Sequence, residues 1–135
     1  MCFLPHTGLP PIYDCGSCED GRPYHVMKLI KGITLSSLLK AGEASEQECF
    51  KIFSDICETM AFAHSHEVIH LDLKPDNVMV GAFGEVHVMD WGLARWQFHP
   101  TAMDPRGAEL VVSEERCGIN GTPEYMAPEQ ARGDE

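Results

Sequence analysis

Positive charge is scarce in this sequence. Its 135 residues include 10 lysines and arginines against 21 aspartates and glutamates, so the formal net charge at neutral pH is -11. Nucleic acids and anionic membranes attract proteins through clustered lysine and arginine. We therefore expect neither a nucleic acid nor an anionic membrane as a partner.

Long apolar runs are also missing. No stretch of the sequence approaches the roughly 20 apolar residues that a membrane-spanning helix needs. The first residues lack the charged start and apolar centre of a secretory leader. We expect a cytoplasmic protein with no membrane segment in this chain, a compartment in which thiols stay reduced. The sequence does not indicate an oligomeric state.

Paired cysteine motifs are few. Among six cysteines, only Cys15 and Cys18 have the C-x-x-C spacing of a zinc knuckle. A structural zinc site needs four ligands, and only His6 and His25 lie near enough in sequence to complete one. The alternative, which we favour, is an ordinary loop between two strands.

The pattern of apolar residues predicts both strands and helices, and therefore an α+β fold. Residues 12–14 and 24–30 read as an antiparallel strand pair. Thr34 is a suitable cap for a helix over residues 35–40, and Gly42 suits its C-terminal end. The length suits one domain or part of one.

A longer helix is predicted after the capping box at residues 45–48, where serine is followed three positions later by glutamate. Apolar residues then recur at helical spacing over about five turns. We expect this stripe to face the core; its members are Cys49, Phe50, Ile52, Phe53, Ile56, Cys57, Met60 and Ala61.

Two short β-type runs, at residues 78–80 and 85–89, are separated by a turn that contains two glycines. This pattern predicts a hairpin. Because the two arms of a hairpin run side by side, Asn77 and Asp90 should lie at the same end of it, where one metal ion could contact both.

Three motifs surround this hairpin. Residues 70–77 read HLDLKPDN, residues 90–92 read DWG, and residues 121–129 read GTPEYMAPE. The first two place the carboxylates of Asp72 and Asp90 in order with a lysine, Lys74, and an asparagine, Asn77. Transfer of a phosphoryl group depends on positioning and charge stabilisation, and such side chains provide both.

The ordered set resembles the catalytic half of a bacterial-type (Hanks-type) serine/threonine protein kinase domain. The resemblance implies a partial protein-kinase-like α+β fold. It assigns residues 1–27 to the end of the N-lobe sheet, 28–32 to the hinge, 33–89 to the C-lobe with the catalytic loop, and 90–129 to the activation segment.

The resemblance also implies roles for individual side chains. Asp72 would be the catalytic base, Lys74 the cation for the transferred phosphate, and Thr122 the threonine that shapes the acceptor pocket. Asn77 and Asp90 would hold Mg²⁺, which prefers hard oxygen ligands. The expected reaction transfers the γ-phosphate of ATP to a serine or threonine hydroxyl of a protein substrate.

The adenine site is implied at four positions. Met27 corresponds to the residue at the back of the pocket, and Met79 to the floor under the adenine ring. Lys28 would offer its carbonyl and Ile30 its N–H. Backbone groups recognise adenine in this family, so the side chains at the last two positions carry little information.

The sequence departs from the family pattern in several ways. Leu71 replaces the arginine that normally binds an activation-loop phosphate. Trp91 replaces phenylalanine, and we expect it to pack against His70. No Gly-rich loop or V-A-I-K lysine is present in the 135 residues, although activity in this family requires that lysine.

We therefore expect a kinase domain truncated at both ends, with exposed apolar patches and marginal stability. The alternative is a catalytically inactive kinase-like binding module, or the product of a broken gene.

Overall fold

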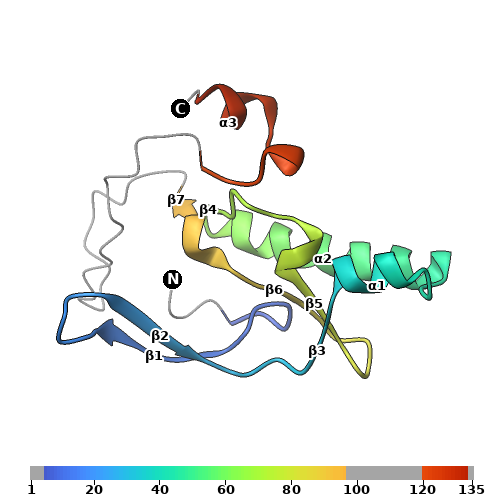
Figure 1. The fold of residues 1–135 in the computed structure, drawn as a ribbon, viewed down its shortest axis with the longest axis horizontal. Coiled ribbons are helices and arrows are strands. Elements are labelled where there is room, and N and C mark those ends of the chain that lie inside the picture. Colours follow the sequence, from blue (N-terminus) through green and yellow to red (C-terminus); the bar gives the residue numbers. More distant parts are fainter. Residues whose placement is uncertain (1–4, 97–119, 134–135) are drawn as a thin grey trace.

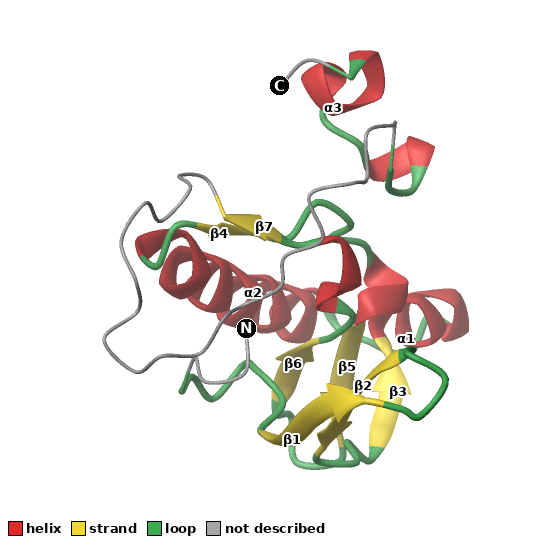
Figure 2. Cartoon of the chain, turned by 90° about the vertical axis from the view of Figure 1, so that its left-hand side faces the viewer, coloured by secondary structure: helices red, strands yellow, loops and turns green. Residues whose placement is uncertain are grey.

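The computed structural model describes residues 5–96 and 120–133. A long helix, α2, lies between a three-stranded antiparallel sheet and a short strand pair (Figures 1 and 2). The strands are β1 (Ile12–Ser17), β2 (Pro23–Met27), β3 (Gly32–Thr34), β4 (Val68–Ile69), β5 (Val78–Gly81), β6 (Val86–Val88) and β7 (Arg95–Trp96). The helices are α1 (Leu35–Ala41), α2 (Glu46–Ser65) and α3 (Pro128–Arg132), with 3-10 turns at Pro75–Asn77, Trp91–Leu93 and Pro123–Tyr125.

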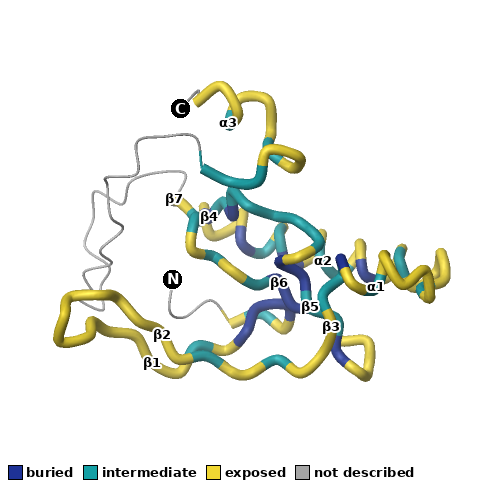
Figure 3. Tube along the Cα trace, in the orientation of Figure 1, coloured by how far each residue is buried: buried dark blue, intermediate teal, exposed yellow. Residues whose placement is uncertain are grey.

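Strands β1 and β2 form the antiparallel pair that the sequence predicts. The pair reaches away from the rest of the molecule and is mostly exposed (Figure 3). The prediction that the second strand continues to residue 30 is wrong, because β2 ends at Met27. Lys28 still donates its N–H to Pro11 O at 2.9 Å. Beyond that bond the opposing residues, Pro10 and Pro11, have no N–H with which to continue the ladder.

Both predicted helix starts are confirmed. Thr34 Oγ1 accepts the Ser37 N–H at 3.1 Å and caps α1, which ends at Gly42 with a left-handed φ of 68°. At α2, Ser45 N donates to Glu48 Oε2 at 2.8 Å, and Glu48 N donates to Ser45 Oγ at 3.2 Å. These reciprocal bonds satisfy backbone donors that the first turn of a helix leaves unpaired.

The predicted apolar stripe of α2 is partly wrong. Ile52 is buried, but Phe50 and Phe53 are 76% and 63% exposed. The buried face of the helix runs instead through Ile52, Thr59 and Ala63. These residues lie on the side that contacts β6 and β4, whereas no described segment covers the face that carries Phe50 and Phe53.

The core is small. Ile52, Val78 and Val86 form its buried centre; half-buried apolar residues pack around it, namely Leu35, Leu38, Ile56, Leu73 and Val80. Single apolar side chains such as Leu29 and Phe83 are also largely exposed among the described residues, but the exposed apolar patches stay a prediction. Marginal stability stays a prediction. No helix in the described ranges is long and apolar enough to cross a bilayer.

The segment before β1 is irregular, as its prolines predict, but it is packed. Gly8 and Leu9 are buried, and Gly8 O accepts the Val88 N–H of β6 at 2.8 Å. A Cβ atom on Gly8 would lie 1.8 Å from Thr59 Oγ1 of α2. This contact is possible only for glycine, and it anchors the start of the described chain to α2.

We predict that Gly8→Ala destabilises the fold by about 1–3 kcal/mol, the usual cost of overpacking. Thr59 cannot readily move aside, because it is buried and its hydroxyl donates to Asp55 O at 2.8 Å. Urea denaturation measures the change. The exposed neighbour substitution Thr7→Ala is the control and should stay within about 0.5 kcal/mol of the parent chain. Equal midpoints for Gly8→Ala and the parent would contradict the close packing.

Candidate functional site

The β5–β6 hairpin is confirmed and positions the two predicted metal ligands. Val78 pairs with Val88, and Met89 N donates to Asn77 O at 2.7 Å. Asn77 precedes β5 and Asp90 follows β6 by two residues, so both lie at one end of the hairpin. Asp90 has a left-handed φ of 54° and accepts the Gly92 N–H on Oδ1. Aspartate adopts this conformation more readily than most non-glycine residues, because its short side chain can bond to the nearby backbone.

A buried histidine connects the two motifs. His70 is 1% exposed, and its Nδ1 accepts the Asp72 N–H at 3.2 Å. Its Nε2 lies 3.0 Å from Met89 O; because a carbonyl can only accept, Nε2 carries the proton. Burial lowers the pKa of His70, which keeps the ring neutral.

The predicted packing of Trp91 on His70 is confirmed, with ring centroids 4.4 Å apart. The indole Nε1 donates to Val88 O at 3.0 Å, so the larger aromatic also fastens the turn after β6. Tryptophan therefore keeps the aromatic contact expected at this position and adds a hydrogen bond that phenylalanine cannot make.

Three predicted catalytic side chains meet in one hydrogen-bonded triangle. Lys74 Nζ donates to Asp72 Oδ2 at 2.8 Å and to Thr122 Oγ1 at 2.7 Å. Thr122 Oγ1 in turn donates to Asp72 Oδ1 at 2.7 Å. Thr122 is 50 residues from Asp72 in sequence, so the triangle joins the catalytic loop to the segment that precedes α3.

Asn77 completes the arrangement. Its Nδ2 donates to Asp72 O at 2.9 Å and lies 3.2 Å from Asp72 Oδ2. With the amide nitrogen engaged in this way, the oxygen of Asn77 is left as its metal-ligating atom. Asn77 and Asp90 thus offer a small set of hard oxygen donors, which fits Mg²⁺ because that ion keeps several waters and phosphate oxygens.

A larger metal cage is not formed. Within residues 5–96 and 120–133, no three His, Cys, Asp or Glu side chains gather to hold an ion. The zinc alternative at Cys15 and Cys18 therefore gains no support from the described part of the chain.

The hydrogen bonds around Asp72 set its protonation. Burial raises the pKa of this carboxyl, but the hydrogen bonds from three neighbouring side chains and the charge of Lys74 lower it more. The pKa of Asp72 therefore lies below its ordinary value. The pKa of Lys74 is raised, chiefly by its hydrogen bond to Asp72. The pair is ionised at neutral pH.

The four predicted adenine residues are less closely joined. Met27 ends β2, Lys28 is exposed, and Ile30 is half-buried in the irregular link to β3. Met79 lies in β5, paired with Thr34 of β3. The link at residues 28–31 therefore runs directly into the strand beside Met79, although no described contact joins Met79 to the other three.

Gln130 also contacts the catalytic loop, and the sequence motifs do not predict this contact. Its side chain reaches the carbonyls of Leu71 and Asn120, and the only signal in the sequence is its place directly after A-P-E.

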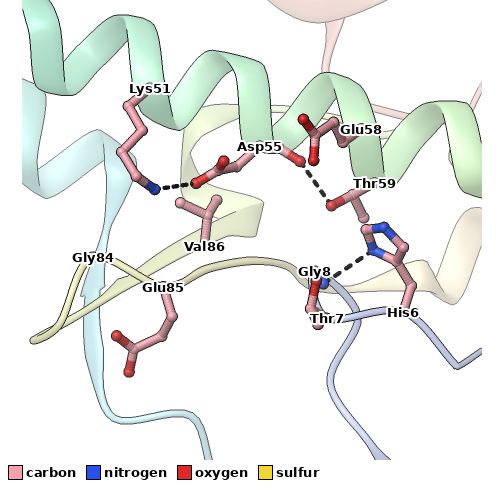
Figure 4. A pocket seen from close by; sticks show the side chains of 10 residues that line it. All are labelled: His6, Thr7, Gly8, Lys51, Asp55, Glu58, Thr59, Gly84, Glu85 and Val86. Carbon is pink, nitrogen blue, oxygen red and sulfur yellow. Dashed lines mark hydrogen bonds and ion pairs between the residues drawn. The ribbon is translucent and has the colours of Figure 1, made fainter.

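A cavity of about 210 Å³ lies between α2, the segment at His6–Gly8 and the β5–β6 turn (Figure 4). Lys51 pairs with Asp55 across 2.7 Å, and His6 Nδ1 accepts the Gly8 N–H. None of the predicted site residues lines this cavity.

Comparison with known proteins decides the family. Residues 12–135 match the description Protein kinase domain. The chain belongs to the protein kinase family. The predicted resemblance and the partial kinase-like α+β fold are therefore confirmed, and the named relatives support assignment to the serine/threonine kinases. The division into N-lobe, hinge, C-lobe and activation segment stays a prediction. Most of the activation segment, residues 97–119, lies outside the described residues.

The short strand β7, which directly precedes residue 97, is not predicted from the sequence; it pairs with β4.

The chain is similar to several curated bacterial proteins and spans about a fifth or less of their length. It is 39% identical over 154 residues to serine/threonine-protein kinase PknD of Chlamydia trachomatis, and 37% identical over 149 residues to PknD of Chlamydia felis. Each alignment covers 96% of this chain and 16% of the relative. Serine/threonine-protein kinase PknB of Mycobacterium leprae is 35% identical over 97% of this chain and 20% of its own length.

We predict a pH-dependent role for Asp72 in stability. In the folded state the pKa of Asp72 lies below the ordinary value of 3.8, so the ionised carboxylate stabilises the fold at higher pH. This contribution to the unfolding free energy is lost as the pH falls through the folded-state pKa. Asp72→Asn removes the carboxylate but keeps its shape. The gap in unfolding free energy between the parent and this variant should therefore be larger at about pH 6 than at about pH 3.

Urea denaturation at the two pH values measures this gap. The control is Asp76→Asn, which alters an exposed carboxylate of the same loop that accepts none of the bonds described above. A gap for Asp72→Asn that is equal at both pH values would contradict the prediction.

Proposed function

We propose that this chain is the phosphoryl-transferring part of a serine/threonine kinase, which uses Mg-ATP to phosphorylate a serine or threonine of a protein. The observation that carries the proposal is the triangle of Asp72, Lys74 and Thr122, with Asn77 bonded to Asp72. An ordinary surface ion pair would not be tied to a threonine 50 residues away.

Asp72 acts on the substrate hydroxyl in this proposal. Each carboxylate oxygen has two lone pairs, so Asp72 can accept the substrate O–H while it keeps Lys74 and Thr122. A carboxylate of low pKa is a weak base. It therefore mainly aims the hydroxyl oxygen at the γ-phosphorus, and it takes the proton as the new O–P bond forms and the bond to the leaving ADP breaks.

Lys74 supplies the positive charge beside that reaction. Its ammonium is bound to Asp72 and Thr122 but has a third N–H donor, which is available to an oxygen of the transferred phosphoryl group. Mg²⁺, when bound, neutralises phosphate charge, and Asn77 and Asp90 are the residues proposed to hold it. A lysine two positions after the base favours serine and threonine over tyrosine as acceptors.

The nucleotide base is proposed to bind at Met27, Lys28, Ile30 and Met79. Lys28 already uses its N–H for Pro11, which leaves its carbonyl for the adenine amino group. We also propose a cytoplasmic location, because no stretch of the 135 residues approaches the apolar length of a membrane-spanning helix. The 135 residues contain no Gly-rich loop and no V-A-I-K lysine, so binding and catalysis are tested separately.

We predict that calorimetry detects Mg-ATP binding to the chain and that Asp90→Ala weakens it at least tenfold, because the phosphates lose a metal-mediated contact. Asp20→Ala, in the exposed β1–β2 turn, removes a similar charge away from the site and should bind like the parent. Equal binding by the parent and by Asp90→Ala would contradict the proposed metal site.

For catalysis, we predict that transfer of ³²P from ATP to serine- or threonine-containing peptides falls by about 10²–10⁴-fold in Asp72→Asn, the usual contribution of a positioned base. Asp76→Asn should retain the parent rate. Mg-ATP binding without any transfer by the parent chain would overturn the enzymatic proposal and favour a kinase-like binding module.

A further inference from the structure

The carbonyl of Leu71 is the centre of a second contact between the catalytic loop and the segment before α3. Leu71 has a left-handed φ of 64°, which is unfavourable for a leucine. Its oxygen accepts Gln130 Nε2 at 2.5 Å. The same nitrogen donates to Asn120 O at 2.8 Å. One amide therefore links residues that are 59 and 10 positions away from it in sequence.

The backbone at Gly121 lies close to the Gln130 amide. A Cβ atom on Gly121 would lie 2.8 Å from Gln130 Nε2 and 3.0 Å from Leu71 O, and Gly121 has a φ of 126°. Only glycine permits this approach. The backbone at Gly121 therefore leaves the space in which Gln130 contacts Leu71 and Asn120.

The linked residues are the immediate neighbours of the catalytic triangle. Leu71 precedes Asp72, and residues 120–121 precede Thr122, so the Gln130 amide holds the two segments whose side chains meet 2.7 Å apart at Asp72 and Thr122. Neither η3 (Pro123–Tyr125) nor α3 contains a fully buried residue, so apolar burial within these two elements contributes little to this placement. Polar contacts therefore hold this part of the site in place.

We propose that Gln130 is a positioning residue. Its uncharged amide holds the segment that carries Thr122 in place beside the catalytic loop. This inference rests on the proposed kinase function for its catalytic consequence, but its structural content is independent of it. Leucine at position 71 cannot bind a phosphate, and both bonds of the Gln130 amide go to backbone carbonyls, so the proposed link itself contains no phosphorylated side chain. The amide carries no charge, and its bonds do not depend on the protonation of a side chain.

The test is Gln130→Met in the full chain, which keeps the length and neutrality of the side chain but removes both donors. Amide hydrogen exchange at residues 120–126 and 71–74 should become about tenfold faster, because two hydrogen bonds are lost. Exchange in the middle of α2 should not change. Gln47→Met is the matched control, since Gln47 is exposed on α2, and it should leave both regions unchanged.

Unchanged exchange at residues 120–126 in Gln130→Met, or an equal increase throughout the chain, would overturn the proposal. The second result would mean that Gln130 contributes only general stability. If Gln130→Met does not fold, Gln130→Leu, which is also uncharged and has no donors, provides the comparison. Phosphatase treatment of the parent chain should leave the exchange pattern unchanged, and faster exchange at residues 120–126 after treatment would also overturn the proposal.

Exchange is measured without catalysis, so its outcome stands even where the proposed kinase activity fails. If the parent chain phosphorylates peptides, Gln130→Met should lower kcat/KM for the peptide acceptor about tenfold and leave the KM for ATP unchanged. An equal rise in both KM values would contradict a role confined to the acceptor side.

Discussion

The neutral ring of His70 is the contact on which the site depends. One nitrogen accepts the Asp72 N–H and the other donates to Met89 O, so a single buried side chain joins the catalytic loop to the strand that leads to Asp90. A protonated imidazole has two donors and could not accept the Asp72 N–H. Burial, which disfavours the charged form, therefore maintains both the tautomer and the connection.

Outside the hydrophobic core, hydrogen bonds hold the parts of the site together. The inner part of the site is supported by buried β5 and β6 residues such as Val78 and Val88, whereas the outer part, with the half-buried Thr122 and Gln130, lies beside η3 and in α3, which contain no fully buried residue. Polar contacts are directional, so they can fix the register of a segment that apolar packing leaves undetermined. The closeness of Thr122 to Asp72 follows from that directionality.

Local signals in the sequence were sufficient for local structure. The capping box at Ser45, the glycine turn of the β5–β6 hairpin and the order of the kinase motifs each depend on neighbours in sequence, and each predicts what the structure contains. The exposed position of Phe50 and the bonds of Gln130 depend on partners far along the chain. Helical spacing cannot distinguish which of two adjoining apolar faces is covered, and no periodicity marks a single amide that reaches two carbonyls.

The packing of Gly8 has a mechanical consequence for the β1–β2 hairpin. The chain is fastened to α2 and β6 just before the hairpin, and to β5 through β3 just after it. Between these anchors, residues 9–11 lead into the hairpin and the irregular residues 28–31 lead out of it. The position of the hairpin is therefore set at its two ends, and the same short link that leaves it at Met27 leads into β3, the strand that pairs with Met79.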